Sequence, residues 1–309
     1  MTAERPTGAG ETGRAGRRPG GTAAVVVNYE SGPLLARCVV ALVVAAADEV
    51  VVVDNGSSDG SLAAAEATGL VDAVVRPGRN LGYGAGANRG VAVTRGDVVL
   101  VCNPDVEVSP EALVRLVDAL DRDPGLGLVG PLIRATTGER YPSARRFPSL
   151  LDAAGHALLG LFAPDNRFTR AYRMDDLAES GTYDVDWVSG ACFVVRRGAF
   201  EQVGGFDESY FMYAEDVDLC WRLGRRGWRI GYVTDAEAVH VQGVSTARHP
   251  YAMLVHHHVS LFRFAARSST GWRRLALPAV AAGLAVRAAL AFVHHWAGPE
   301  GRHRCPHRP

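Results

Sequence analysis

Short runs of β-branched residues alternate with helical stretches over the first 130 residues of the chain. Valine-rich runs between polar turns are typical of buried parallel strands, and the stretches between them have the length of crossover helices. Ser109 and Pro110 are residue types that cap and open such a helix. The alternation predicts an α/β fold with a doubly wound parallel sheet. The predicted strands are "AAVVVNY" (23–29), "EVVVVD" (49–54), "DAVVR" (72–76) and "DVVLVC" (97–102).

The pattern weakens after about Gly130, and residues 142–182 are expected to form long loops. Regular structure is predicted again at 186–197, as a strand that runs into a short helix. A helix is expected after Ala214 and a strand at 228–233.

Both ends of the chain differ in composition from the middle. Residues 1–21 are rich in Gly, Arg and Thr without an apolar core, so we expect a disordered arm, neither signal peptide nor membrane helix. The tail at 266–309 is basic, and its apolar run "LALPAVAAGLAV" is shorter than the roughly twenty residues that span a bilayer. Two interpretations stay open: a helix packed on the domain, or attachment to an anionic membrane surface through arginines.

The composition excludes several classes of chemistry. Lysine is absent, which rules out a Schiff-base lysine and the Walker phosphate loop. The five cysteines are scattered singly, without disulfide or zinc spacing, and fit a reducing cytoplasm. Positive and negative residues balance at 33 each, and no nucleic-acid partner is expected.

Polar residues follow three of the predicted strands, at the edge where open α/β sheets bind ligands. Asp54 can serve its own Asp-Asn-Gly-Ser turn, whereas calcium fits it poorly because the glycine and glutamate of an EF-hand loop are missing. Asp105 is a better metal candidate, since a divalent cation that bridges phosphates needs only one or two protein carboxylate oxygens. The residues are Asn28, Tyr29 and Glu30 after the first strand, Asp54 after the second, and Asn103 with Asp105 after the fourth.

The segment "NLGYGAGANRG" (80–90) is rich in glycine. It can be matched to the dinucleotide fingerprint through Gly82, Gly84 and Ala87, which would indicate an NAD-linked oxidoreductase. The fingerprint belongs at the first strand–helix turn, however, and here that turn is "NYESGP". The alternative is a close backbone approach to another phosphate-bearing ligand, with Asn88 or Arg89 near the phosphates.

Two adjacent carboxylates, Glu215 and Asp216, follow the aromatic cluster in "YFMYAEDVDLCWR" (210–222). Acidic residues in a first helical turn favour the helix dipole without any other role. On that interpretation Val217, Cys220, Trp221 and Gly224 form the apolar stripe, and Asp218 pairs with Arg222 on the outer face. The alternative is a general base beside a sugar or lipid-linked acceptor.

Taken in order, these segments resemble the inverting family 2 glycosyltransferases, and most closely their rhamnosyltransferase-like bacterial branch. The resemblance covers about 23–265. It implies a GT-A fold, a Rossmann-like mixed sheet flanked by helices, followed here by a basic C-terminal helical tail. Its motifs are "VVVNY", "VVVVDNGSSDGS", "NLGYGAGANRG", "VCNPDVEV", the stretch from "WVSGACFVV" to "GRRGWRI", and "AVHVQGVST".

The resemblance implies a role for each candidate residue. "NPD" replaces the family's D-x-D metal motif, so Asn103 stands for its first carboxylate. Asp105 would ligate Mg2+ or Mn2+, and His240 is either a further ligand or a structural histidine. Asp216 would be the catalytic base, with Glu215 orienting it or holding the acceptor. The nucleotide-sugar site would contain Asn28, Tyr29, Glu30, Asp54, Asn80, Gly82, Asn88, Asn103 and Gly190, and the acceptor site Trp187, Phe211 and Tyr213.

The expected protein is a cytoplasmic, metal-dependent, inverting glycosyltransferase, peripheral at the inner face of the plasma membrane. Its domain is placed at 22–265, with a nucleotide-sugar-binding half (22–130) and an acceptor-binding half (131–265). The resemblance points first to dTDP-L-rhamnose as donor. The acceptor would be a polyprenyl-diphosphate-linked sugar or a cell-wall or surface polysaccharide. The rivals are the NAD-linked oxidoreductase and a non-catalytic glycan-binding protein with the same fold.

Overall fold

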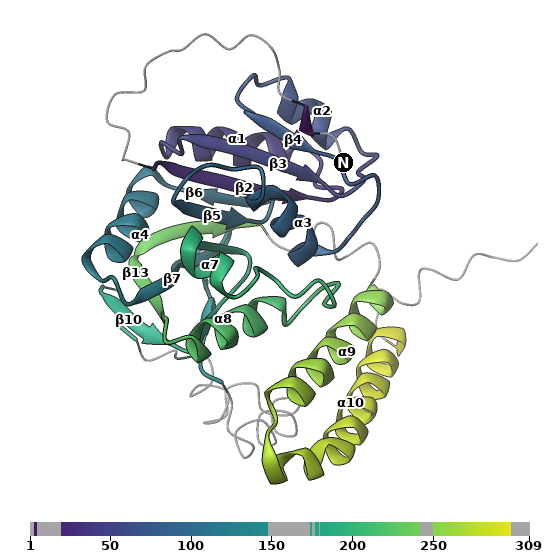
Figure 1. Cartoon of the computed structure of the whole chain (residues 1–309). Helices are drawn as coiled ribbons and strands as arrows, with labels where there is room; N and C mark the ends of the chain where they lie inside the picture. The colour runs from purple at the N-terminus through teal and green to yellow at the C-terminus, as the bar shows by residue number, and fades with distance from the viewer. Residues whose placement is uncertain are drawn as a thin grey trace, which may run out of the picture.

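The computed structural model describes residues 3–4, 20–147, 174, 177–178, 180–241 and 250–297. Within them, a mixed 11-stranded sheet lies between two layers of helices (Figure 1). Its strands are β1 (Ala3–Glu4), β2 (Thr22–Asn28), β3 (Glu49–Asp54), β4 (Ala73–Val75), β5 (Val98–Cys102), β6 (Val106–Val108), β7 (Leu126–Ala135), β8 (Arg140–Tyr141), β10 (Thr182–Val185), β12 (Cys192–Arg196) and β13 (Arg229–His240). A second sheet pairs β9 (Ala144–Arg145) with β11 (Trp187–Val188).

Side chains of alternate residues in the strands face opposite helical layers, as the period of two requires. Ala24 and Val26 of β2 belong to the core beneath α1 and α4, whereas Val25 and Val27 face α3, α7 and α8. The expected α/β fold with helices on both faces is confirmed. The helices are α1 (Leu34–Val44), α2 (Ser61–Glu66), α3 (Tyr83–Val91), α4 (Pro110–Arg122), α7 (Arg197–Gln202), α8 (Glu215–Arg225), α9 (Pro250–Ser268), η2 (Gly271–Ala276) and α10 (Leu277–Ala297).

The order of the strands brings distant segments to one edge of the sheet. β4, β3, β2 and β5 are parallel, so their carboxyl ends lie on the same side. β12 runs antiparallel between β5 and β7, so its first residues meet the end of β5, and the Asn103 N–H donates to the Ala191 carbonyl at 2.9 Å. β13 has an irregularity between Val233 and Glu237 and continues beside β6, which carries His240 to this edge.

Strand β7 was not expected from the sequence. Its segment "LGLVGPLIRA" contains two glycines and a proline, residues that lower strand propensity, yet it is buried between β12 and β13 over its first eight residues. Residues 148–173 of the predicted loop region lie outside the described residues, as does most of the arm predicted at 1–21. Of that arm, Ala3–Glu4 pair with β4.

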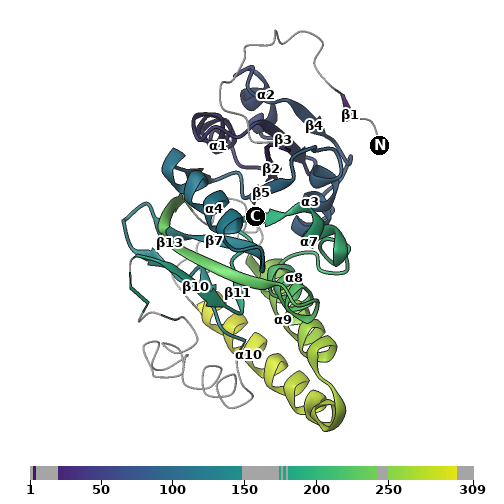
Figure 2. The same cartoon turned by 60° about the vertical axis from the view of Figure 1, so that its left-hand side comes forward.

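The C-terminal part forms a helical hairpin, α9 and α10, which projects from the sheet domain beyond α8 (Figures 1 and 2). The prediction that the tail's apolar run is too short to span a bilayer is wrong. Helix α10 continues past Arg287 through "AALAFV", so Gly271–Val293 forms one stretch of 23 residues, which contains an 18-residue window with a mean hydropathy of 1.9. Length and composition alone would let this stretch cross a membrane, and none of it is buried within the protein.

Candidate active site at the carboxyl edge of the sheet

The ends of β2 and β3 form a dense polar cluster. Asn28 and Asp54 are paired in the parallel register, and the Asn28 amide Nδ2 donates to Asp54 Oδ1 at 2.9 Å. The same nitrogen contacts the Ser57 and Ser61 hydroxyls, and Asp54 Oδ2 accepts from the Ser57 N–H at 3.2 Å. Asp54 therefore accepts the hydrogen bonds within its own turn that the first interpretation predicted. A contact between Asp54 and a bound nucleotide would be additional to these hydrogen bonds.

Glu30 closes this cluster from the loop after β2. Its Oε1 accepts from both the N–H and the hydroxyl of Ser58, at 2.8 and 2.9 Å. The residue has a positive φ of 52° although it is not a glycine, and such backbone strain gathers at functional sites. Its neighbour Tyr29 is partly exposed at the same edge.

The glycine-rich segment approaches the protein's own backbone. A Cβ at Gly82 would lie 2.2 Å from the Phe211 carbonyl oxygen, which accepts the Tyr83 N–H at 3.1 Å. Asn80 Oδ1 accepts the Gly82 N–H at 2.9 Å and fixes this turn. A glycine is thus required at position 82, where the glycine-rich segment meets the backbone at Phe211. The interpretation of this segment as an approach to a phosphate-bearing ligand did not predict this contact.

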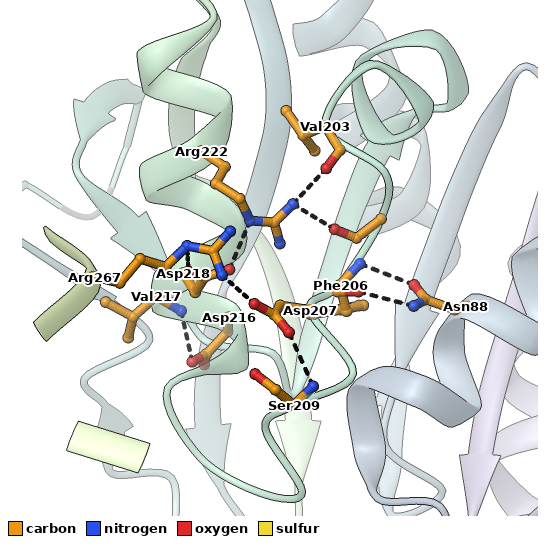
Figure 3. A network of polar contacts seen from close by, with 11 residues as sticks. Asn88, Val203, Phe206, Asp207, Ser209, Asp216, Val217, Asp218, Arg222 and Arg267 are labelled. Carbon is orange, nitrogen blue, oxygen red and sulfur yellow. Dashed lines mark hydrogen bonds and ion pairs between the residues drawn. The ribbon is translucent and has the colours of Figure 1, made fainter. Parts of the chain in front are cut away.

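Asn88 and Arg89 contact the loop at 206–208. The Asn88 amide exchanges two hydrogen bonds with the Phe206 backbone, both at 2.9 Å (Figure 3). It also contacts Glu208. Arg89 pairs with Glu208 at 2.7 Å. The 206–208 loop thus holds the Asn88 amide, and the place of Asn88 among the nucleotide-sugar-binding residues stays a prediction.

Asn103, Asp105 and His240 converge beside the polar cluster, from the end of β5 and the end of β13. His240 Nε2 lies 3.1 Å from Asp105 Oδ1 and 3.4 Å from Asn103 Nδ2. Both Asp105 and His240 are about nine-tenths buried, and His240 Nδ1 is buried without a hydrogen-bond partner.

This set of donors fits a divalent cation that is only partly held by protein. It offers one carboxylate, one imidazole and one amide group, while diphosphate oxygens and water would supply the other ligands. Among the described residues no group of three or more His, Cys, Asp or Glu side chains is arranged so that it could hold a metal ion without other ligands.

The two carboxylates at the start of α8 have different surroundings. Glu215 is 5% exposed, and its Oε2 has no hydrogen-bond partner. Asp216 is partly exposed, and its two oxygens accept the N–H groups of Gly190 and Val217, each at 2.8 Å. Burial raises the pKa of both carboxyls, and the Asp216 charge adds to the shift of Glu215. Asp216 is therefore the carboxylate that backbone N–H groups hold in one orientation and that remains partly accessible to solvent.

The chain enters α8 through two strained residues. Tyr213 and Ala214 have φ values of 68° and 61°, in the left-handed region that disfavours residues with a Cβ. This turn places Asp216 next to Gly190, where an added Cβ would lie 3.3 Å from the Asp216 Cβ. Gly190 also accepts the Tyr83 hydroxyl through its carbonyl, so the carboxylate is joined to the glycine-rich segment.

The aromatic residues predicted for the acceptor site lie on β11 and in the loop before α8. Trp187 is 6% exposed and lies under the Arg145 guanidinium, 4.9 Å from its ring centroid. Phe211 and Tyr213 contact residues of α9, with ring centroids 4.6 Å from His256 and 5.2 Å from His257. The sequence did not single out Arg145, which lay in a predicted loop, or the α9 histidines, whose "HHH" run was the only signal available.

A buried ionic network holds the loop before α8 (Figure 3). Arg222 donates to Asp218 at 2.6 Å and to the Val203 and Gly205 carbonyls, and Arg267 of α9 bonds Asp218 and Asp207. The predicted pair of Asp218 with Arg222 is confirmed, but its predicted place on an outer face is wrong, because Asp218 is fully buried. The face that α8 buries contains Glu215, Asp218, Leu219, Cys220 and Leu223.

The sequence that forms this edge of the sheet can be compared with known protein families. The family model described as "Glycosyltransferase like family 2" matches residues 19–258. The chain is a family 2 glycosyltransferase. The match spans the polar cluster, the "NPD" segment and the α8 carboxylates, and it removes the oxidoreductase alternative.

Relatives of this glycosyltransferase include rhamnosyltransferases. The N-acetylglucosaminyl-diphospho-decaprenol L-rhamnosyltransferase of Mycobacterium tuberculosis is 45% identical over 266 residues, which cover 82% of this chain and 86% of that enzyme. Rhamnosyltransferase WbbL of Escherichia coli K12 is 30% identical over 171 residues, 51% of this chain and 61% of that protein. The rhamnosyltransferase-like branch is thereby confirmed.

Solved structures confirm the GT-A fold. The mannosyltransferase PcManGT of Pyrobaculum calidifontis, in complex with GDP-Man and Mn2+, has a TM-score of 0.56 at 20% identity, over 90% of this chain and 75% of that one. GalNAc-T7 with UDP, GalNAc and Mn2+ has a TM-score of 0.53 at 16% identity, over 71% and 43% of the two chains.

Proposed function

We propose that this glycosyltransferase transfers L-rhamnose from dTDP-L-rhamnose, with inversion, to a polyprenyl-diphosphate-linked sugar in cell-wall or surface-glycan synthesis. The observation that carries the substrates is the 45% identity, over most of both chains, to an enzyme named for L-rhamnose transfer to N-acetylglucosaminyl-diphospho-decaprenol. The family match at 19–258 includes the candidate site from β2 to α8.

Asp216 takes the proton in the proposed reaction. The acceptor hydroxyl attacks the anomeric carbon of the donor from the face opposite the diphosphate, and the configuration inverts as the diphosphate leaves. Two backbone N–H groups fix the Asp216 carboxylate, its raised pKa makes it a better proton acceptor, and its partial exposure leaves room for the hydroxyl. Burial and the Asp216 charge raise the pKa of Glu215 to about 8, so Glu215 is mostly protonated at neutral pH and Asp216 is the charged carboxylate of the pair.

The donor lies, in this proposal, across the carboxyl ends of β2, β3 and β5. Asn28, Glu30 and Asp54 form the preorganised polar wall for the nucleoside, with Tyr29 and Asn80 beside it. Asp105 and His240, with the Asn103 amide, would hold Mg2+ or Mn2+, which would neutralise charge on the leaving diphosphate. Backbone hydrogen bonds beside Gly82 and at Gly190 hold Asp216 and the loop before α8 against the segment that would bind the donor.

We place the enzyme at the inner face of the plasma membrane. The hairpin exposes large apolar side chains that no part of the described chain covers, among them Leu275 at 84%, Val286 at 61% and Leu290 at 52%. Exposed arginines at 273 and 274 flank this surface, and anionic headgroups attract such residues. A lipid-linked acceptor would be presented at the same surface.

The test uses purified enzyme with a panel of nucleotide sugars, Mg2+ or Mn2+, and N-acetylglucosamine linked by a diphosphate to a short polyprenol. Transfer from dTDP-L-rhamnose, and not from UDP-glucose, UDP-N-acetylglucosamine or GDP-mannose, is expected. Preferred use of another donor would overturn the assignment of rhamnose. Binding of a nucleotide sugar without nucleotide release or transfer to any acceptor would favour the non-catalytic, glycan-binding alternative.

A further inference from the structure

Helix α9 contacts the loop before α8 (residues 207–214) near both ends of that loop. Arg267 of the helix bonds Asp207 at the start of the loop (Figure 3). Near the end of the loop, the Phe211 ring packs on His256, with ring centroids 4.6 Å apart. The first helix of the apolar hairpin therefore lies directly against the segment that leads to the α8 carboxylates.

Ser260 of α9 forms a hydrogen bond that leaves its own helix. Its hydroxyl donates to the Met212 carbonyl at 2.9 Å, and the residue is 3% exposed. A helical serine often donates instead to the carbonyl four residues earlier, as Ser268 of α9 does to Phe264 at 2.8 Å. One helix thus contains two serine hydroxyls, of which one bonds its own helix and the other bonds the loop before α8.

The Ser260 bond is one of two that hold successive carbonyls of this loop. The Phe211 carbonyl accepts the Tyr83 N–H at 3.1 Å, from the glycine-rich segment, and the Met212 carbonyl accepts the Ser260 hydroxyl. Residues 213–214 follow directly, with left-handed φ values of 68° and 61°. Because this conformation is unfavourable for residues with a Cβ, it depends on the contacts that surround it.

The turn at 213–214 sets the direction of the proposed base. The Ala214 carbonyl accepts the first helical hydrogen bond of α8, from the Asp218 N–H at 2.9 Å. Asp216 lies in the helical turn that this bond closes, and its Oδ2 accepts the Gly190 N–H at 2.8 Å. A change in the path of the chain at 213–214 would therefore turn Asp216 away from Gly190.

We propose that Ser260 is a positioning residue for the transfer reaction, because its hydroxyl fixes the Met212 carbonyl and thereby the turn that orients Asp216. This inference rests on the proposed role of Asp216 as the base. Helix α9 then serves catalysis directly, in addition to the membrane contact proposed for the hairpin. The proposed donor site lies on other segments, at the ends of β2, β3 and β5, so loss of the Ser260 bond affects proton transfer and not donor binding.

Ser260→Ala and Ser268→Ala make a matched pair, since each removes one hydroxyl from the same helix. Single-turnover transfer by Ser260→Ala should be at least about tenfold slower than in the wild type, because a displaced catalytic group loses much of the rate. Its donor affinity should stay within about twofold, since the loss falls on the chemical step. Ser268→Ala should transfer at the wild-type rate. A wild-type rate in Ser260→Ala, or an equal loss in both variants, would overturn the proposal.

The pH dependence of transfer separates positioning from a general loss of stability. The backbone N–H groups that bond Asp216 lower its pKa, so weakening these bonds raises that pKa. The transfer rate of Ser260→Ala should therefore begin to rise at a higher pH than that of the wild type, because the base acts only when deprotonated. Glu215 and Arg145, whose charges interact with Asp216, are the same in both proteins. A slower variant with an unchanged pH profile would show a merely structural serine and overturn the proposal.

Amide hydrogen exchange tests the turn itself, even if no sugar is transferred. In the full chain without substrate, the Gly190 amide should exchange about fivefold to tenfold faster in Ser260→Ala than in the wild type, because its bond to Asp216 is weakened. In Ser268→Ala it should exchange as in the wild type. An unchanged Gly190 rate in Ser260→Ala would overturn the proposal. Faster exchange in a protein that transfers no sugar would support the role of Ser260 in holding Asp216 and refute the proposed function.

Discussion

Glu215 and Asp216 differ by one position in sequence and strongly in surroundings. A buried carboxyl without a partner for Oε2 is unfavourable when it is charged, and the neighbouring carboxylate makes it more so. The spacing of the residues could predict that a helix begins here, and the resemblance could predict a catalytic pair. Which of the two carboxyls is exposed could not be read from sequence, because it depends on Gly190 and on the left-handed turn at Tyr213 and Ala214.

Replacement of Glu215 by Gln should make the stability of the protein less sensitive to pH. The folded-state pKa of Glu215 is raised, so its favourable contribution is complete below the ordinary carboxyl pKa and is lost as pH rises through the raised value. The melting temperature of Glu215→Gln should therefore equal that of the wild type near about pH 5 and exceed it by a few degrees near about pH 9. Thermal unfolding measured across this range checks the sign, and a difference that shrinks with rising pH would be inconsistent with it.

Asp105→Ala should weaken the metal-dependent part of nucleotide binding. The change removes the carboxylate of the proposed metal site and leaves the polar cluster at Asn28 and Asp54 intact. Calorimetric titration with dTDP, with and without Mn2+, should show metal enhancement in the wild type and little in the variant. Asp118→Ala, which removes an exposed carboxylate of α4, is the control. An unchanged metal effect in Asp105→Ala would refute the role of Asp105.

At the scale of elements, helix α8 depends on a charge network that local spacing could not reveal. Asp218 and Arg222 have the spacing of a surface pair, but Arg267, far along the chain on α9, meets the same aspartate and helps to bury it. Strand β7 was missed for a related reason, since tertiary burial overrides the low propensity of its glycines and proline. The parallel strands before residue 103 were predictable because their pattern is local and continuous.

Two aspartate–arginine pairs with the same spacing make a matched comparison. Asp218→Ala should lower the free energy of unfolding by about 3–5 kcal/mol, because it leaves Arg222 as a mostly buried charge without its carboxylate. Asp118→Ala, which breaks the exposed pair with Arg122 on α4, should cost less than about 1 kcal/mol. Urea denaturation measures both, and equal losses would show that the buried network does not stabilise the loop before α8.

The whole molecule combines a GT-A domain with an apolar hairpin. The domain followed from the order of its motifs, whereas the length of α10 did not, because a single arginine was taken to end the apolar run. Arg287 lies within the helix, and the apolar residues continue after it.

Val286→Glu should reduce the fraction of enzyme that floats with vesicles containing anionic lipid. Val286 is 61% exposed on α10, and a carboxylate there opposes insertion among lipids. Val114→Glu changes a valine that is 56% exposed on α4, on the sheet domain, and should leave flotation unchanged. If both variants float like the wild type, the hairpin is not the membrane contact.

The assignment of Asp216 as the catalytic base is tested by single-turnover transfer with Asp216→Asn. The affinity of this variant for dTDP-L-rhamnose is measured in parallel. Asparagine keeps the size of the side chain and can still accept an N–H bond, but it cannot take a proton. The rate of transfer to the diphosphate-linked acceptor should fall by about 10²–10⁴-fold, the donor affinity should stay within about twofold, and the wild-type product should have the inverted anomeric configuration. Transfer by Asp216→Asn at the wild-type rate, with the donor bound equally well, would contradict the assignment of Asp216 as the base.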